Sequence, residues 1–214
     1  MENLLDKICK NYIRYVLTQG KRPSSVFAFM QEIGQEEKEF YKYFASFEAI
    51  EESVWSTIIE NTLKRIKEEN VYSEYSIREK LLSFCFTLVD EMKNERSFLI
   101  FCVKNNTSPS RFLFTCPNFL KGFKKKFRKF AEELITEGTD SHEIPTRPFF
   151  AERYPDILWL QVQSVINYWV SDYSNNFEKT DEFIEKSVNL TFDILGRNAL
   201  DSTFEFAKFI FQQS

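Results

Sequence analysis

The chain has 214 residues, enough for one large domain or for a small domain followed by a larger one. Its 24 phenylalanines, with only five glycines and six prolines, favour long helices around an aromatic core or cavity over strands and tight turns. A net charge of −4 excludes a chain that is basic throughout, and four scattered cysteines with one histidine lack the spacing of a zinc site.

Apolar residues at helical spacing organise the first third of the chain. The helices predicted there cover about residues 3–18, 24–32, 35–43 and 46–69. Gly20 ends the first, Gly34 supplies the turn between the two short helices, and Ser46 is a suitable N-cap for the long one. The two short helices with a glycine turn between them have the spacing of a helix-turn-helix.

Helical periodicity continues through the rest of the chain, and no useful stretch alternates with a period of two. The further helices are predicted at about residues 77–92, 95–103, 117–137, 154–171, 177–195 and 200–212. Loops are predicted at 104–110 and 138–148 from their composition and their prolines. The sequence therefore predicts an all-α protein of about ten helices.

The stretch FYKYFASFEAI, residues 40–50, covers the end of the second short helix and the start of the long one. Together with Gly34 it resembles the DNA-binding region of the TetR family of bacterial repressors. The resemblance implies a helix-turn-helix domain over residues 1–47 and a helical ligand-binding and dimerisation domain over residues 48–214. The DNA contacts that it implies are Ser24, Ser25, Gln35, Lys38, Tyr41 and Lys42.

Three carboxylates, Glu36, Glu37 and Glu39, occupy the predicted reading helix. DNA is a polyanion, and affinity for it comes largely from basic side chains that neutralise phosphates. Residues 1–47 carry seven basic and six acidic side chains, a weak balance for that purpose. Two functions stay open: a ligand-responsive regulator that binds DNA as a homodimer, or an accessory protein with the same fold and no DNA binding.

Residues 159–195 predict two adjacent amphipathic helices. They resemble the last two helices of TetR proteins, which pair with their counterparts in a four-helix dimer interface. The stretch WVSDYSNNFEKTDEFI, residues 169–184, is also similar to the TetR-like lipid-binding proteins of ubiquinone biosynthesis, which lack DNA binding. The interface residues expected from the apolar pattern are Val162, Val165, Ile166, Trp169, Phe183, Ile184 and Val188.

A small apolar ligand or lipid is expected between helices of the larger domain, where bundles form apolar pockets. The candidate contacts are Phe84, Leu88, Phe101, Phe112, Phe119, Phe123 and Trp159. In KGFKKKFRKF, residues 121–130, the phenylalanines share one helical face. The basic side chains face solvent, an anionic partner or membrane headgroup, or, as the least favoured alternative, nucleic acid.

No constellation of nucleophile, base and orienting group is evident, so neither an enzyme nor a metal or cofactor site is expected. The longest apolar run, residues 98–103, is far shorter than the roughly 20 residues that span a bilayer. The N-terminus has acidic residues and lacks the long apolar run of a signal peptide. The sequence predicts a cytoplasmic protein without integral membrane association.

Overall fold

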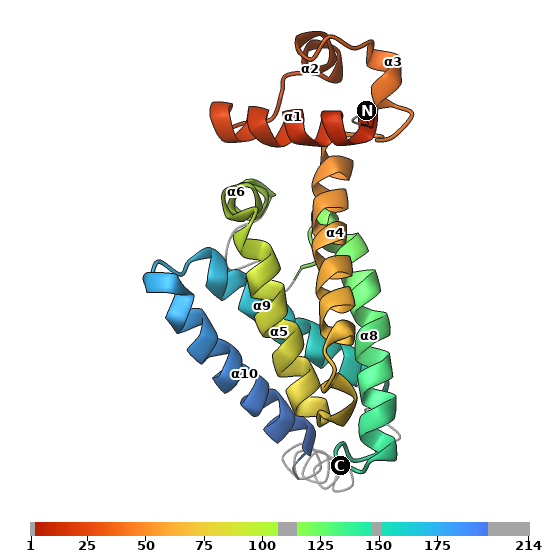
Figure 1. Ribbon diagram of the computed structural model, residues 1–214, viewed down its shortest axis with the longest axis vertical. Helices are drawn as coiled ribbons and strands as arrows, with labels where there is room; N and C mark the ends of the chain where they lie inside the picture. The colour runs from red at the N-terminus through yellow and green to blue at the C-terminus, as the bar shows by residue number, and fades with distance from the viewer. Residues whose placement is uncertain (1–2, 107–114, 147–150, 197–214) are drawn as a thin grey trace, which may run out of the picture. The chain divides into compact units, whose positions relative to one another are not determined.

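The computed structural model describes residues 3–106, 115–146 and 151–196. Every regular element in these ranges is helical, which confirms the all-α prediction (Figure 1). The α-helices are α1 (Leu4–Gln19), α2 (Val26–Glu32), α3 (Glu37–Phe40), α4 (Phe47–Glu68), α5 (Ile77–Lys93), α6 (Arg96–Asn106), α8 (Lys121–Asp140), α9 (Tyr154–Val170) and α10 (Glu178–Gly196). Short 3₁₀ turns are η1 (Tyr72–Glu74), η2 (Asn118–Leu120), η3 (Ala151–Arg153) and η4 (Asn175–Phe177). The helix predicted at 200–212 lies outside the described residues.

The described residues divide into two compact units. The first comprises residues 3–61, 90–106 and 115–126, and the second comprises residues 62–89, 127–146 and 151–196. The divisions fall inside α4, α5 and α8, so each of these helices contributes residues to both units.

The first unit begins with an aromatic cluster that joins α1, α2 and α3 to the start of α4. Tyr12 of α1 stacks on Phe47 of α4 at 5.1 Å between ring centroids, and Phe29 of α2 meets Phe47 edge-on at 5.6 Å. Phe40 of α3 contacts Phe47 from another side, also at 5.6 Å. Ring pairs of this kind add about 0.5–1.5 kcal/mol each to the burial of their apolar surface. Phe47 therefore anchors α1, α2 and α3.

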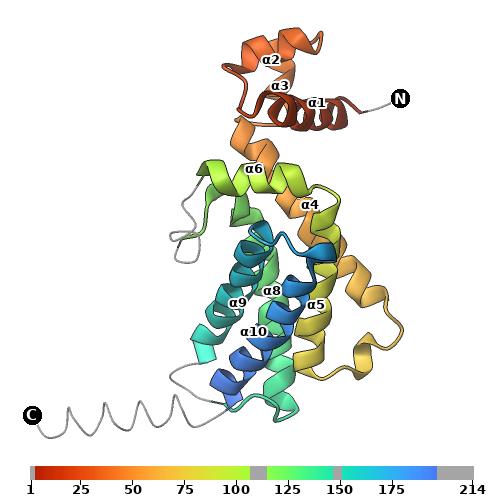
Figure 2. The ribbon, with the colours of Figure 1, turned by 90° about the vertical axis from the view of Figure 1, so that its left-hand side faces the viewer.

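In the second unit, α9 and α10 form a helical hairpin and lie side by side (Figure 2). The carboxylate of Asp172 organises the turn by accepting hydrogen bonds from the N–H of Ser174 at 2.8 Å and from the N–H and hydroxyl of Thr180 at 2.9 and 2.6 Å. Asn176 and Phe177 have positive φ angles of 51° and 64° in the same turn. Asparagine tolerates this region but phenylalanine does not favour it, so the Asp172 contacts hold a strained turn in place.

Replacing Asp172 with alanine is expected to reduce the free energy of unfolding by about 1–2 kcal/mol, the usual cost of losing a helix cap. Burial opposes ionisation of Asp172, but the hydrogen bonds from Thr180 and Ser174 outweigh it and lower its pKa from 3.8 to about 2. Because the folded pKa is the lower one, this stabilisation is complete above pH 3.8 and is lost as the pH falls through about 2.

Urea unfolding of the wild type and of D172A, at about pH 6 and about pH 3, measures this effect. The difference between the two proteins should be smaller at the acidic pH. Asp193, an exposed carboxylate on α10, provides the matched control, and D193A should differ from the wild type by no more than about 0.5 kcal/mol. A D172A difference that stays constant with pH would contradict the assigned role of the ionised carboxylate.

Candidate functional sites

The α2–α3 motif has a capped first helix and a tight glycine turn. The hydroxyl of Ser25 accepts a hydrogen bond from the N–H of Ala28 at 3.1 Å, which satisfies one of the free donors at the start of α2. Gly34 has a φ of +69°, a left-handed conformation that glycine adopts without strain. The N–H of Gln35 then donates to the carbonyl of Met30 at 2.8 Å and fixes the direction of the chain into α3.

Helix α3 is shorter than the helix predicted at 35–43. It covers Glu37–Phe40, and the next residues form a turn in which the N–H groups of Tyr43 and Phe44 both donate to the carbonyl of Phe40 at 3.0 Å. Phe40 and Phe44 are both buried, so the chain turns where two aromatic side chains must reach the core. Packing against Phe47 therefore ends α3 before its local propensity would.

The six predicted DNA contacts all lie on or beside this motif. Gln35 is half-buried, and the exposed side chains are Ser24, Ser25, Lys38, Tyr41 and Lys42. The hydroxyl of Tyr41 donates to the Glu37 carboxylate at 3.3 Å. The motif therefore presents two hydroxyls, a phenol and two ammonium groups to solvent, a set that suits contacts to phosphate oxygens.

Both lysines of the motif are paired with its carboxylates. The ammonium of Lys38 lies 2.5 Å from the Glu36 carboxylate, and that of Lys42 lies 2.7 Å from the Glu39 carboxylate. The hydrogen bond between Lys38 and Glu36 raises the pKa of the Lys38 ammonium and lowers the pKa of the Glu36 carboxylate. Any phosphate that approaches these lysines must compete with carboxylates already in place.

Arg22, between α1 and α2, forms a bridge to α4 that the sequence analysis did not identify. Its guanidinium donates to both oxygens of the Glu51 carboxylate, at 2.9 and 2.8 Å, and also pairs with Glu48. The Tyr12 hydroxyl donates to the same Glu51 carboxylate at 2.7 Å, and Glu51 is fully buried. These four residues are called the Arg22–Glu51 bridge below. No local pattern marks it, because its charged partners are 29 residues apart.

The predicted ligand contacts in the first unit are packed against aromatic neighbours. Phe119 and Phe123 both lie against Trp55 of α4, with ring centroids 5.6 and 6.2 Å away. Phe101 stacks on Phe98 at 6.5 Å within α6. All three predicted contacts are buried, so a ligand at these positions would have to replace ring contacts.

In the second unit, Phe84 and Trp159 approach Phe127 of α8 at 5.2 and 5.9 Å. Leu88, on the same helix as Phe84, is fully buried. The last predicted contact, Phe112, lies outside the described residues. The described ligand candidates therefore belong to both units: Phe101, Phe119 and Phe123 lie in an aromatic cluster of the first, and Phe84 and Trp159 lie in an aromatic cluster of the second.

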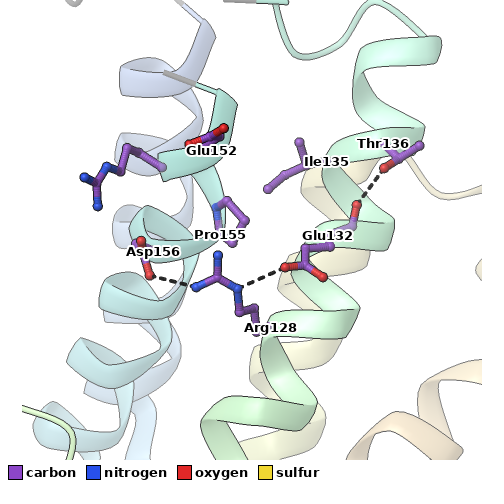
Figure 3. A pocket seen from close by; sticks show the side chains of 8 residues that line it. Arg128, Glu132, Ile135, Thr136, Glu152, Pro155 and Asp156 are labelled. Atoms are coloured by element: carbon purple, nitrogen blue, oxygen red, sulfur yellow. Dashed lines mark hydrogen bonds and ion pairs between the residues drawn. The ribbon is translucent and has the colours of Figure 1, made fainter. Parts of the chain in front are cut away.

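A surface groove of about 610 Å³ lies between α8 and α9, where Ile135 and Pro155 provide its apolar contacts. Figure 3 shows Arg128 between two carboxylates that flank the groove. Its guanidinium lies 2.9 Å from the Glu132 carboxylate on α8 and 3.5 Å from the Asp156 carboxylate on α9. The groove is lined by three carboxylates and two guanidinium groups, and such a charged lining suits a polar ligand better than a lipid.

Six of the seven predicted dimer contacts are buried within the protomer itself. The fully buried ones are Val162, Val165, Ile166, Trp169, Ile184 and Val188. The seventh, Phe183, is half-buried and stacks on Tyr168 with ring centroids 4.4 Å apart and planes 9° apart. The six buried side chains hold α9 and α10 in their own unit.

A different set of apolar side chains faces outward from the same hairpin. Leu160 of α9 is 47% exposed, and Leu190 and Ile194 of α10 are 60% and 37% exposed. With the stacked pair Tyr168 and Phe183 they form what is called the α9–α10 seam below. On α9 the outward apolar side chains Leu160 and Tyr168 lie about two helical turns apart, so apolar spacing alone did not show which side chains face outward.

Histidine, cysteine and carboxylate side chains are the groups that could hold a metal ion or, as thiolates, act as nucleophiles. In the described ranges, no group of three or more histidine, cysteine, aspartate or glutamate side chains is arranged to hold a metal ion. Nor does any helix of those ranges combine the length and apolarity needed to cross a bilayer. Cys85 and Cys102 are buried, and burial raises the pKa of the Cys85 thiol to about 12, so this thiol stays protonated.

Several solved structures share the fold of this chain. A proposed TetR-family transcriptional regulator from Syntrophomonas wolfei str. Goettingen has a TM-score of 0.62 and 15% identity, with 89% of this chain and 94% of that chain covered. A proposed TetR-family regulator from Shewanella sp. PV-4 has a TM-score of 0.58 and 16% identity, with 91% and 98% covered. A transcriptional regulator from Cytophaga hutchinsonii ATCC 33406 has a TM-score of 0.54 and 16% identity, with 92% of this chain and 100% of that chain covered. These likenesses concern the fold.

The sequence itself places the chain in a family. A search of the curated proteins gives no match. Residues 80–210 match the family described as Tetracyclin repressor-like, C-terminal domain, and this match covers more than half of the chain. The structure agrees with this match, because the described elements are all helical and the α2–α3 motif has the spacing of a helix-turn-helix. The chain therefore belongs to the TetR family of transcriptional regulators.

Proposed function

We propose that this chain is a ligand-responsive regulator that binds DNA as a homodimer. Residues 1–47 form its DNA-reading module, and residues 48–214 bind the ligand and the second protomer. The observation that supports the proposal most directly is that one helix-turn-helix carries five exposed polar side chains, Ser24, Ser25, Lys38, Tyr41 and Lys42. Contacts to backbone phosphates from such groups position a reading helix on the duplex.

In the proposed mechanism, a small apolar ligand that enters the aromatic core of the larger domain favours one of two dimer geometries. DNA binding requires the two α3 helices to reach successive major grooves, about 34–36 Å apart along the duplex. The Arg22–Glu51 bridge supports such coupling, because it ties α1 and the α1–α2 connection to the first turns of α4. No catalytic step forms part of the proposal.

The homodimer is proposed to form through the α9–α10 seam. Leu160, Leu190 and Ile194 offer an apolar stripe on one hairpin, and a twofold axis would place it against the same stripe of the partner. Burial of this stripe would remove apolar surface from water without disturbing the side chains already packed inside the protomer.

A second candidate function is a lipid- or isoprenoid-binding accessory protein that keeps the fold without DNA binding. It is favoured by the ion pairs of Lys38 with Glu36 and of Lys42 with Glu39. Residues 21–43 carry four basic and four acidic side chains, so the motif has no net positive charge with which to attract a polyanion.

Salt-dependent binding to random and genomic DNA fragments separates the two functions. A DNA-binding homodimer should bind at about 50 mM salt, and the K38Q/K42Q variant should bind on the order of tenfold more weakly. Its plot of log affinity against log salt should be shallower by about one unit per lysine that contacts a phosphate. The E36Q/E37Q/E39Q variant should bind more tightly than the wild type, because both lysines lose their carboxylate partners.

The matched control is K64Q/K186Q, which neutralises two exposed lysines that also pair with carboxylates, Glu68 and Glu182. It should bind DNA as the wild type does. If neither the wild type nor E36Q/E37Q/E39Q binds DNA at about 50 mM salt, the regulator proposal is wrong. A lipid retained by the purified protein in native mass spectrometry would then support the accessory function.

A further inference from the structure

A second groove lies in the first unit and is separate from the aromatic clusters discussed above. It has a volume of about 330 Å³ and is called the α1–α4 groove. It is lined by Leu5, Asp6, Cys9 and Ile13 of α1, by Ser53, Val54, Thr57, Ile58 and Asn61 of α4, and by Glu91, Asn94 and Glu95 at the α5–α6 junction. This volume is at the lower end of the range for small-molecule sites.

The side chains of α1 and α4 give the groove an apolar interior. Among the lining side chains, Ile58 is buried, and Leu5, Ile13 and Val54 are half-buried. All four are branched aliphatic residues, so this part of the groove can hold a small hydrocarbon or aromatic body.

The polar side chains around this interior are acidic or neutral, and none of the twelve described lining residues is basic. Asp6 and Glu95 have no ion-pair partner within the described part of the chain. Glu91 accepts a hydrogen bond from the Asn61 amide at 3.4 Å. Burial raises the pKa of Glu95, which means that its negative charge is poorly solvated and would gain from a nearby cation.

We propose that the α1–α4 groove binds a small organic cation, an ammonium group carried on an apolar body. The apolar part would lie against Ile58 and Val54, and the cation would lie between the carboxylates of Asp6 and Glu95. A bare metal ion is disfavoured, because no cluster of three or more ligating side chains exists among the described residues. An anionic ligand would meet three carboxylates. The proposal concerns binding to the protein alone and does not depend on the DNA-binding proposal.

Cys9 provides a reporter inside the groove. It is half-buried, its thiol is hydrogen-bonded with Ser53, and it lies close enough to Asp6 to feel that charge. Cys116 is also half-buried, but it lies near Lys121 and Lys124 and does not line the groove. A ligand in the groove should therefore shield Cys9 from a thiol reagent and leave Cys116 reactive in the same sample.

The test measures alkylation of Cys9 and Cys116 by iodoacetamide in the full-length protein. The protein is then digested, and mass spectrometry of the peptides gives the extent of alkylation at each cysteine. Benzyltrimethylammonium is the probe, with benzyl alcohol and phenylacetate as neutral and anionic probes of the same body. Benzyltrimethylammonium should slow the alkylation of Cys9 severalfold in a saturable manner and leave Cys116 unaffected. The neutral and anionic probes should give little protection.

The D6N/E95Q variant should need on the order of tenfold more benzyltrimethylammonium for the same protection, because it removes two charge contacts. The T57W variant, which places a large ring at an exposed position of the groove wall, should also lose protection. E132Q removes a carboxylate from the groove between α8 and α9 and is the matched control. In this variant the probe should protect Cys9 as it does in the wild type. Equal protection by all three probes, or none at millimolar concentrations, would overturn the proposal.

Discussion

The R22A variant is expected to lose about 3–5 kcal/mol of unfolding free energy, the usual cost of breaking a buried ion pair by removing one partner. Arg22 supplies both hydrogen bonds of a bidentate pair to Glu51, whose side chain is fully buried. Without the guanidinium, the Glu51 carboxylate keeps the Tyr12 hydroxyl but loses its positive partner. Urea unfolding followed by far-ultraviolet circular dichroism measures the loss.

Arg14 is the matched control for this variant. It is exposed and donates to Asn11 on its own helix, so R14A should change stability by no more than about 0.5 kcal/mol. The R22M/E51L double variant replaces the pair with apolar side chains and should recover part of the loss, because the buried Tyr12 hydroxyl is left without its acceptor. An R22A loss below about 1 kcal/mol would mean that the bridge does not hold α1 on α4.

The L160D/L190D variant is expected to convert the proposed homodimer into monomers at micromolar concentration. Leu160 and Leu190 are 47% and 60% exposed, so each would contribute about 1 kcal/mol when the partner buries the rest of its surface, and each appears twice in a symmetric interface. An aspartate at the same position would instead have to lose its hydration without a partner. Sedimentation velocity or light scattering reports the mass, and circular dichroism reports the helical content.

Leu17 of α1 offers a closely matched control, because it is 47% exposed, as is Leu160. L17D should remain dimeric. V162D places a charge at a fully buried position and should lower the helical content as well as the association. A dimer that survives L160D/L190D would exclude the seam as the interface, and a monomeric wild type would exclude the homodimer itself.

The helices were predictable from sequence because their causes are local. The long helix predicted at 46–69 is α4 (Phe47–Glu68), and those predicted at 154–171 and 177–195 are α9 (Tyr154–Val170) and α10 (Glu178–Gly196). Gly20 ends α1 as predicted, and its N–H donates to the Val16 carbonyl at 2.8 Å. Caps, glycines and apolar spacing act within a few residues, so they are visible in the sequence.

The length of α3 was less predictable, because contacts with distant residues determine it. The local sequence favours a helix through Tyr43, but Phe40 and Phe44 turn into the core beside Phe47, and the helix ends at Phe40. The carboxylates of the motif were visible in the sequence. Their pairing with Lys38 and Lys42 depends on side-chain positions that only the folded chain defines.

The sequence by itself determined the all-helical class and the approximate positions of the helices, since both follow from periodicity and composition. The TetR-like order of short and long helices was expected from the resemblance of Gly34 and residues 40–50 to that family. Only the tertiary structure decided which apolar face of α9 and α10 lies inside the protomer, because both faces carry apolar side chains. The pairing of Arg22 with Glu51, and the assembly of the α1–α4 groove from α1, α4 and the α5–α6 junction, likewise join residues far apart in the chain. Such long-range contacts arise from packing, which no local pattern of residues encodes.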